Sequence, residues 1–506
     1  MPKPQHIKVR KGTDGAFEVE GEAHRLVGHR LEPNVADTPD GVWAEWRWDG
    51  SQLVLRTDRF GFMPIFYCCG ADSIMLSTSL IDLVNRGAPT EIDATALSVF
   101  LHIGYYLDDT TPFKAIRVAP PNGTIRWNGE LEVIDDRPMR GVTPDVTYEQ
   151  AIEGYIALFQ RAITRRLPKD DRFAVPLSGG RDSRHILLEL LRQGHRPSLV
   201  VTSEFPPPKS SPEIEPARKV CEAAGLEQVV AVPPSHFEQE YRQNLLQHCC
   251  ADEGGWMMGM ADMLHERVHT SYDGVAGDMY GPARVFSREW LDRYGEGKVD
   301  EITHSMLGRN VEPLVRMIGG DYAGSGDRDA AFHALKTELL RYQHNANPFG
   351  EFTTFNRARR EVGQQAYSVL AGLETVYAPF LDHELNDFLA QVPWPTMWQA
   401  DLHTDVVKRA YPDYAHLPYA GKTGSVSAGG MYARFAMQVL AYARRRNPDW
   451  LKRIPRLAAH WAMAAGSRRY RSTVKWATPA RILNLILVDE LRKDPSTLAS
   501  HFAREP

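Results

Sequence analysis

Short runs of alternating or continuous apolar residues, separated by turn residues, make up most of the first 140 or so positions. The clearest runs read VWAEWRWDGSQLVLRTD, IFYCCGADSIMLST and GTIRWNGELEVI. Alternation with a period of two residues is typical of strands with one buried face. Asp49-Gly50 and Asn128-Gly129 lie between such runs and favour tight hairpin turns. The pattern therefore predicts a β-rich domain.

The pattern changes to a helical period near residue 145. Thr147 and Gln150 have the spacing of a capping box, in which two side chains satisfy backbone N–H groups at a helix start. Apolar residues then recur at helical spacing until Pro168 ends the run: Ile152, Tyr155, Phe159, Ile163 and Leu167. We therefore place a domain boundary here, which divides the chain into residues 1–144 and 145–506.

Beyond this boundary, predicted strands and helices alternate. FAVPL, SLVVTS and QVVAVP are apolar enough to be buried strands, and RHILLELLRQG and EIEPARKVCEAAGL between them are typical of helices. Such alternation predicts an α/β fold, a doubly wound parallel sheet that binds ligands at the carboxyl ends of its strands. From about residue 285 onward the pattern is mostly helical.

Composition and charge exclude several classes of protein. The chain has 506 residues, 43% hydrophobic and 24% charged, a balance that excludes a disordered or fibrous protein. Its net charge of −5 gives no reason to expect a nucleic-acid partner. No apolar run reaches the roughly 18 residues of a membrane span, and the five cysteines lack the spacing of a metal site or a disulfide framework. We expect a cytoplasmic, unanchored protein.

The candidate chemistry lies between the first strand of the predicted sheet and its helix, at Ser178–Ser183 with the sequence SGGRDS. Gly179 and Gly180 let the backbone approach an anion, and the helix that follows directs its free N–H groups to the same place. Asp182 suits Mg²⁺, which bridges phosphate oxygens. A serine-capped glycine turn without any ligand is the structural alternative. The order strand, loop, helix, strand favours phosphate binding.

Several motifs in one order resemble the asparagine synthetase family of ATP-dependent amide-forming ligases. LSGGRDSRHIL resembles its SGGxDS pyrophosphate loop, DGVAGDMYGPA its GEGSDE-type loop, YAPFLDHELNDFLAQVP its PFLD segment and LPYAGKTG its lysine-bearing loop. DRFGFMPIFY with LSTSLIDLV resembles the late part of the family's glutaminase domain. The resemblance extends over roughly residues 40 to 425, which makes it more specific than any single glycine loop.

The resemblance implies the cofactors ATP and Mg²⁺ and a role for seven residues. Pyrophosphate would be held by Ser178, Gly179, Gly180, Asp182 and Ser183, and Mg²⁺ by Asp182 and Asp278. Lys422 would be catalytic, since a lysine at this place in the family stabilises the negative charge that builds up as an acyl-adenylate forms and is attacked. Glu213 also matches an acidic family position, but a carboxylate at a helix start explains it equally well.

Departures from the family pattern concern the substrate. Val275 stands where asparagine synthetases have a glutamate and β-lactam-forming relatives a tyrosine. Since valine cannot move a proton, a base for the incoming amine must come from elsewhere, or the amine must arrive unprotonated. Thr375 replaces a glutamate common just before PFLD. The carboxylate substrate is therefore expected not to be aspartate.

The first domain departs further. Class II glutaminases use an amino-terminal Cys as nucleophile, whereas residue 2 here is Pro, unless an upstream start supplies a Cys. Cys68 and Cys69 lie in a strand pattern that favours a structural role. The opening strands of the family have no evident counterpart before Gly41. We therefore expect a degenerate, truncated domain, amino-terminal-nucleophile-hydrolase-like in fold, followed by a doubly wound ATP-pyrophosphatase domain with a helical C-terminal part.

The predicted activity is an AMP-forming ligase that adenylates a small-molecule or peptide carboxylate and couples it to an amine or ammonia, without hydrolysing glutamine. By resemblance the chain lies nearest to relatives in specialised metabolism, such as β-lactam synthetases and lasso-peptide cyclases, or to sugar-acid amidating enzymes. Two alternatives stay open: a subunit fed ammonia by a separate glutaminase, and a silent ATP-binding partner. The basic stretch 444–471 is either a solvated helix face or a docking site for an acidic carrier or peptide. The sequence leaves the substrate and a homodimeric state open.

Overall fold

The computed structural model describes most of the chain, including both predicted domains. The described residues are 3–35, 38–141, 145–204, 211–233, 235–281, 288–308, 312–315, 318–421, 429–451, 461 and 477–496. Among these residues, no helix has the length and apolar character needed to cross a bilayer.

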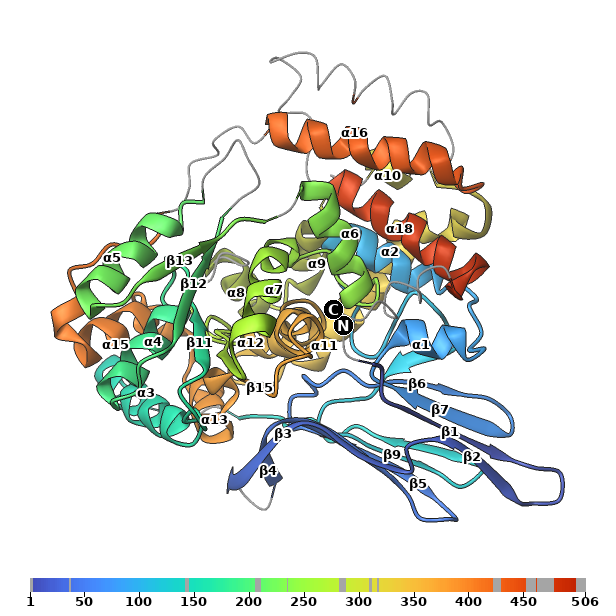
Figure 1. Ribbon diagram of the computed structural model, residues 1–506, viewed down its shortest axis with the longest axis horizontal. Coiled ribbons are helices and arrows are strands. Elements are labelled where there is room, and N and C mark those ends of the chain that lie inside the picture. Colours follow the sequence, from blue (N-terminus) through green and yellow to red (C-terminus); the bar gives the residue numbers. More distant parts are fainter. Residues whose placement is uncertain are drawn as a thin grey trace.

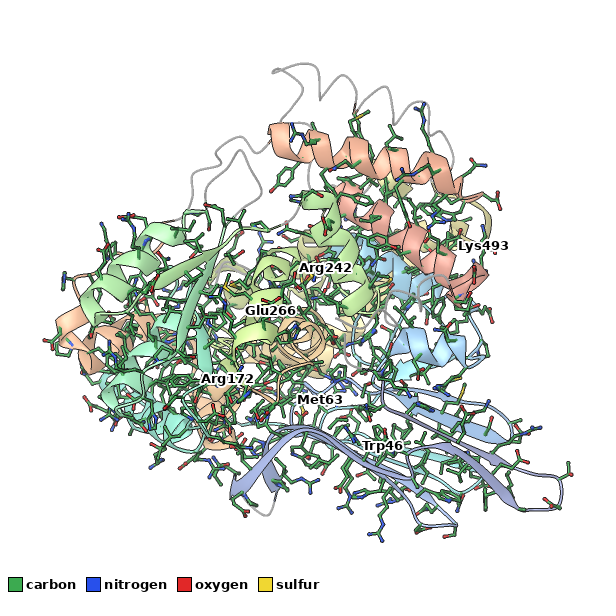
Figure 2. The ribbon with its side chains drawn as sticks, viewed as in Figure 1. Trp46, Met63, Arg172, Arg242, Glu266 and Lys493 are labelled. Atoms are coloured by element: carbon green, nitrogen blue, oxygen red, sulfur yellow. The ribbon has the colours of Figure 1, made fainter. Side chains whose placement is uncertain are left out.

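The first part of the chain forms two five-stranded antiparallel sheets, packed face to face at the lower right of Figure 1. The sheet orders are β2-β1-β7-β6-β8 and β10-β9-β5-β4-β3. Trp46 and Trp127 are buried in the core between them, and Figure 2 shows Trp46 within the sandwich. The strands are β1 (His6–Lys11), β2 (Phe17–Gly21), β3 (His24–Val35), β4 (Thr38–Trp48), β5 (Leu53–Thr57), β6 (Phe66–Cys69), β7 (Ser73–Ser77), β8 (Ile116–Val118), β9 (Thr124–Trp127) and β10 (Leu131–Ile134).

Both predicted hairpins are present. Gly50 and Gly129 have φ of +98° and +115°, values that an L side chain rarely adopts. The expectation of no opening strands before Gly41 is wrong, because β1, β2 and β3 precede it. β2 and β3 are largely exposed and rich in charged residues, so they lack the apolar signal from which strands are predicted.

The second part contains a five-stranded parallel sheet with helices on both sides (Figure 1). Its strands are β11 (Phe173–Pro176), β12 (Leu199–Ser203), β13 (Gln228–Ala231), β14 (Thr270–Tyr272) and β15 (Thr375–Tyr377), in the order β13-β12-β11-β14-β15. The first three strands are those predicted. The structure thus has antiparallel sheets followed by a parallel α/β sheet, as expected at this coarse level.

Helices make up most of the remainder. They include α1 (Leu80–Asn85), α2 (Ala94–Ile103), α3 (Tyr148–Thr164), α4 (Asp182–Arg192), α5 (Ile214–Ala224), α6 (His236–Leu246), α7 (Met258–Arg267), α8 (Arg288–Gly295), α9 (Val299–Leu307), α10 (Glu312–Val315), α11 (Arg328–Arg341), α12 (Pro348–Thr353), α13 (His383–Gln391), α14 (Trp394–Met397), α15 (Leu402–Ala410), α16 (Gly429–Arg446) and α18 (Ala477–Lys493). Two π-helical segments, η3 (Thr354–Val362) and η4 (Gln365–Val369), follow α12. The predicted capping box of Thr147 and Gln150 begins α3.

The two parts share buried surface. One apolar core joins Phe60 and Phe62 of the first part to α3 and the parallel sheet, and another joins α1 and α2 to α18. Arg166, just after α3, donates to Asp40 of β4 and to Asp382 at the start of α13, at 2.7 Å each. All three side chains are buried. The two parts are joined by buried apolar and ionic contacts. The domain boundary near residue 145 therefore stays a prediction from the sequence.

Candidate active site

The candidate site lies where the order of the parallel strands reverses. β11 pairs with β12, the next strand along the chain, on one side and with β14 on the other, so the strand order changes direction at β11. Such a switch point leaves a crevice at the carboxyl edge, the usual ligand site of an open α/β sheet. Ser178–Ser183 follows β11, and the loop 273–281 follows β14. Both predicted motifs therefore meet at this crevice.

Two serine hydroxyls fix the loop after β11. The backbone N–H of Ser178 donates to Ser183 Oγ at 3.0 Å, and the two hydroxyl oxygens are 3.1 Å apart. The N–H of Gly180 donates to Ser178 Oγ at 3.1 Å. α4 begins at Asp182, so its positive end opens onto the same loop. This arrangement suits an anion such as a phosphate group.

Gly179 is held from two sides. Its N–H donates to Glu213 Oε2 at 2.8 Å, and its carbonyl accepts the N–H of Ala420 at 2.9 Å. A Cβ on residue 179 would lie 2.8 Å from that of Ala420, so only glycine fits without a shift. The carboxylate of Glu213 thus already accepts the N–H of Gly179 in this loop. The sequence did not by itself assign Glu213 to the site, although its match to an acidic position of the family could have indicated this contact.

Asp182 lies against the glycines of the loop after β14. A Cβ on Gly277 would lie 2.7 Å from Asp182 Cγ, and one on Gly274 would lie 3.0 Å from Asp182 Cβ. This loop also contains Asp278. Burial and the nearby charge of Asp182 raise the pKa of Asp278. The two predicted metal carboxylates are therefore close enough to repel each other.

This pair of carboxylates fits a hard divalent cation. Two like charges near each other in a buried place are stabilised by a cation between them, and carboxylate oxygens are what Mg²⁺ prefers. Over the described ranges, no group of three or more His, Cys, Asp and Glu side chains is arranged around a metal position. Phosphate oxygens and water would therefore have to complete the coordination shell.

A pair of histidines lies behind Asp182. His403 Nδ1 is 3.2 Å from Asp182 Oδ1, and His403 Nε2 is 3.1 Å from His185 Nδ1. His185 is fully buried and stacks on Phe159 at 3.6 Å, and burial holds its pKa well below the usual value. A neutral His185 can fix the tautomer of His403, which in turn orients the carboxylate. Sequence patterns had not indicated either histidine.

Comparison with known families agrees with this geometry. The sequence model of the family described as asparagine synthase matches residues 154–270, from within α3 to the first residue of β14. The match includes the loop Ser178–Ser183. The chain carries an asparagine synthase domain. No curated protein matches the chain in a search by sequence.

The family assignment confirms the resemblance at its coarse level. Asparagine synthases are ATP-dependent ligases that form amide bonds, and we assign this general chemistry to the chain. Ser178, Gly179, Gly180, Asp182 and Ser183 lie at one crevice together with Asp278.

Residues 417–420, just before Lys422, are hydrogen-bonded to α4 and to the loop Ser178–Ser183 of this asparagine synthase domain. Lys422 itself lies outside the described residues. Arg184 of α4 donates to the carbonyls of Leu417 and Pro418, and its guanidinium carbon is 3.9 Å from the Tyr419 ring centre. Ala420, two residues before the lysine, is bound to Gly179.

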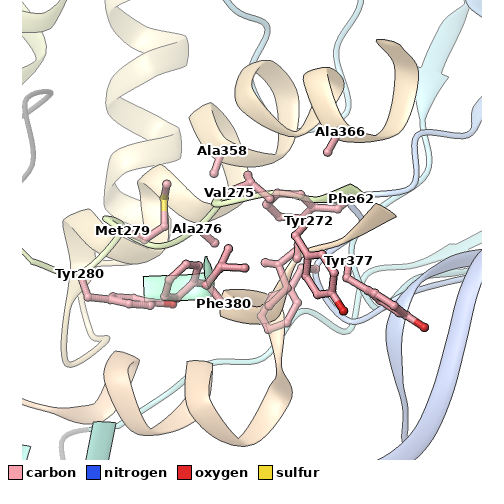
Figure 3. Packing of buried hydrophobic residues seen from close by; sticks show 14 of the residues in the cluster. Phe62, Tyr272, Val275, Ala276, Met279, Tyr280, Ala358, Ala366, Tyr377 and Phe380 are labelled. Carbon is pink, nitrogen blue, oxygen red and sulfur yellow. The ribbon is translucent and has the colours of Figure 1, made fainter. Parts of the chain in front are cut away.

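Val275 of the asparagine synthase domain is buried in an apolar cluster and cannot act as an acid or a base. Figure 3 shows it packed with Phe62 of the first part and with Ala358 and Ala366 of the π-helical segments. Thr375 lies in β15 and is also buried. The loop after β14 therefore presents a carboxylate at Asp278 and an apolar contact at Val275.

The other signals in the sequence have structural explanations. Cys68 lies in β6, and burial raises its pKa to about 11, so little thiolate exists at neutral pH. In the basic stretch, Arg444, Arg445 and Arg446 are exposed at the end of α16, but Trp450 and Trp461 are buried and cannot contact a partner. Six further basic residues of this stretch lie outside the described residues: Lys452, Arg453, Arg456, Arg468, Arg469 and Arg471.

Proposed function

We propose that the protein is an AMP-forming ligase that adenylates a carboxylate, releases pyrophosphate and couples the acyl group to an amine or ammonia. The observation that supports this most is the meeting of Ser178–Ser183 and Asp278 at the switch point of the sheet. The N-terminus of α4 beside two serine hydroxyls suits a pyrophosphate leaving group. A neighbouring carboxylate pair suits the cation that such a group requires.

In this proposal each residue has a distinct task. The N-terminus of α4 and the hydroxyls of Ser178 and Ser183 bind pyrophosphate oxygens. Asp182 and Asp278 would hold Mg²⁺, which when bound neutralises phosphate charge. His403 lies beside Asp182, and Arg181 is fixed at the crevice by an ion pair with Asp401. Lys422 stabilises the negative charge that builds up as the acyl-adenylate forms and is attacked.

We further propose that this ligase hydrolyses no glutamine. The Cys68 thiol, in the segment that resembles the family's glutaminase domain, is buried and protonated at neutral pH. A role in specialised metabolism, a cytoplasmic site of action and a contact of the exposed Arg444–Arg446 with an acidic carrier or peptide belong to the same proposal. All five cysteines are free, which accords with a reducing compartment.

Isotope exchange between pyrophosphate and ATP tests the first step. The protein is incubated with Mg²⁺, ATP, labelled pyrophosphate and each member of a panel of carboxylic acids. We expect exchange that depends on one class of acid and falls at least 100-fold in Asp182→Ala and in Asp278→Ala. That loss corresponds to about 2.7 kcal/mol of transition-state stabilisation.

Asp171→Ala is the matched control, since this exposed carboxylate precedes β11 at the opposite edge of the sheet. Its exchange rate should equal that of the wild type. Release of ADP and phosphate in place of AMP and pyrophosphate would refute the mechanism. ATP binding without exchange for any acid would instead favour a silent nucleotide-binding protein.

A further inference from the structure

A charged pair lies beside the site on a segment that crosses the carboxyl end of β12. Ala251 forms a bridge with Tyr105, and the N–H of Asp252 donates to the carbonyl of Gly104 at 3.0 Å. Further on, the carbonyl of Trp256 accepts the hydroxyl of Ser203, the last residue of β12, at 2.8 Å. Glu253 lies between these two attachments. Its position is therefore fixed relative to the ligand edge of the sheet.

Arg357 of the π-helical segment η3 pairs with this glutamate. Its Nη2 is 2.7 Å from Glu253 Oε2, and its Nε is 2.9 Å from Glu361 Oε2. Side-chain exposure is 44% for Glu253, 17% for Arg357 and 4% for Glu361. The buried carboxylate of Glu361 thus holds the guanidinium of Arg357, and this guanidinium in turn holds the exposed carboxylate of Glu253. π-Helical turns of this kind are frequent at functional sites.

Arg357 also connects the pair to the candidate reaction centre. The next residue, Ala358, packs beside Val275 of the loop after β14 (Figure 3). Arg357 lowers the pKa of Asp278, against the larger raising effects of burial and Asp182. The charged pair therefore lies within electrostatic reach of the proposed metal carboxylate.

The chemistry of Glu253 suits a cation from solution. Only its Oε2 is bound to Arg357, and a carboxylate has about four acceptor sites, so the exposed side chain can accept further N–H donors. Trp256, three residues along, is 41% exposed and offers an apolar, electron-rich surface. An exposed carboxylate and an exposed indole on one short segment are suited to an ammonium group attached to a carbon chain.

We infer that Glu253 is the subsite for the amine substrate and that the nitrogen donor is a primary amine bound as its ammonium ion, with its carbon chain against Trp256. This inference rests on the proposed function and deepens it. It assigns the binding of the amine to a carboxylate outside the loop in which Val275 stands. The subsite binds and aligns the amine, and the Glu253 carboxylate takes the proton that the ammonium ion must lose before its nitrogen can attack. Activation of the acid depends on the residues around Ser178–Ser183.

The test separates amine binding from acid activation. Butylamine hydrochloride and ammonium chloride serve as probes in two measurements on the full-length protein with Mg²⁺ and ATP. Calorimetric titration of each probe needs no acid substrate. AMP release at varied amine concentration, with the acid that supports pyrophosphate exchange, gives KM and kcat for the amine.

Glu253→Gln should weaken butylamine binding and raise its KM at least tenfold, while acid-dependent pyrophosphate exchange stays within twofold of the wild type. Trp256→Ala should raise the KM for butylamine and leave that for ammonium unchanged. Glu266→Gln is the control, an exposed carboxylate on α7 that is labelled in Figure 2. It should behave as the wild type in every measurement.

Other outcomes overturn the inference. An unchanged KM in Glu253→Gln, or turnover with ammonium but not with butylamine, would exclude the amine subsite and leave the ligase intact. Loss of exchange together with amine binding would make Glu253 a structural residue. Absence of exchange with every acid would remove the proposed function itself, because that half-reaction needs no amine.

Discussion

At the scale of single residues, the candidate site depends on charged and polar groups fixed by partners far away in the sequence. Glu213 binds the amide of Gly179 across 34 positions, and Asp401 pairs with Arg181 across 220. Sequence patterns could predict Ser178–Ser183, because glycine, serine and aspartate at that spacing have a local meaning. They could not predict the ion pair of Arg181 with Asp401, nor His403 or Arg357, since only the fold brings such residues to the crevice.

Buried neutral histidines should make stability depend on pH. His383 is fully buried near Asp40, and burial, followed by Arg59, lowers its pKa from 6.5 to about 3. The unfolded chain then binds more protons between these values, so the stabilisation is complete above pH 6.5 and is lost as pH falls toward 3. This group alone should cost about 2 kcal/mol between pH 6.5 and 5.

Urea unfolding at several pH values measures this effect. His383→Gln removes the titrating group, so its free energy of unfolding should fall less between pH 6.5 and 5 than that of the wild type, by about 2 kcal/mol. The exposed His344→Gln serves as the control and should keep the slope of the wild type. Equal slopes in the wild type and His383→Gln would show that another group titrates.

At the scale of elements, the site consists of two loops on one sheet edge. Long periodic segments were predictable: α3, α4 and α5, together with β11, β12 and β13, show the apolar pattern expected of buried elements. The three-residue strands β14 and β15 are too short to give a period. The loop after β14 was found instead through its resemblance to a family motif.

Contact between the two loops can be tested at a glycine. In Gly277→Ala the new Cβ would meet Asp182 Cγ at 2.7 Å, so the carboxylate must shift. We expect acid-dependent pyrophosphate exchange to fall at least tenfold with less than about 1 kcal/mol lost in stability.

The same loop supplies the control. A Cβ on Gly281 meets nothing within 4 Å, so Gly281→Ala should keep full exchange activity. If both variants were equally active, Asp182 would not need the position that the glycine allows.

At the scale of the whole molecule, buried ion pairs join the antiparallel sandwich to the parallel sheet. Arg166 between Asp40 and Asp382 is the central one, and Arg59 pairs in the same region with Asp387 at 2.8 Å. These three-dimensional contacts had no signal in the sequence, because charged residues are by default expected at the surface. They also explain why the sandwich and the parallel sheet share one core.

Removing the central cation should destabilise both parts together. Arg166→Met leaves two buried carboxylates without their main partner, at a cost of about 3 to 5 kcal/mol in the free energy of unfolding. Arg161→Met, in the last turn of α3, removes an exposed pair with Glu384 and should cost about 0.5 kcal/mol or less. Urea unfolding followed by tryptophan fluorescence and by circular dichroism should give coincident transitions for each variant. A loss of less than 1 kcal/mol in Arg166→Met would contradict this role.

The place of β15 in the sheet has a consequence for the order in which the molecule can assemble. This strand pairs with β14, although about a hundred residues separate them along the chain. β14, which leads into the Asp278 loop, can therefore pair with β15 only after the chain has been synthesised as far as Tyr377. A fragment cut to the matched segment 154–270 would keep α4, α5 and α7, but it would lack that strand, all of β14 except its first residue, and the Asp278 loop. Expression of that segment alone should yield an aggregation-prone chain with an open strand edge.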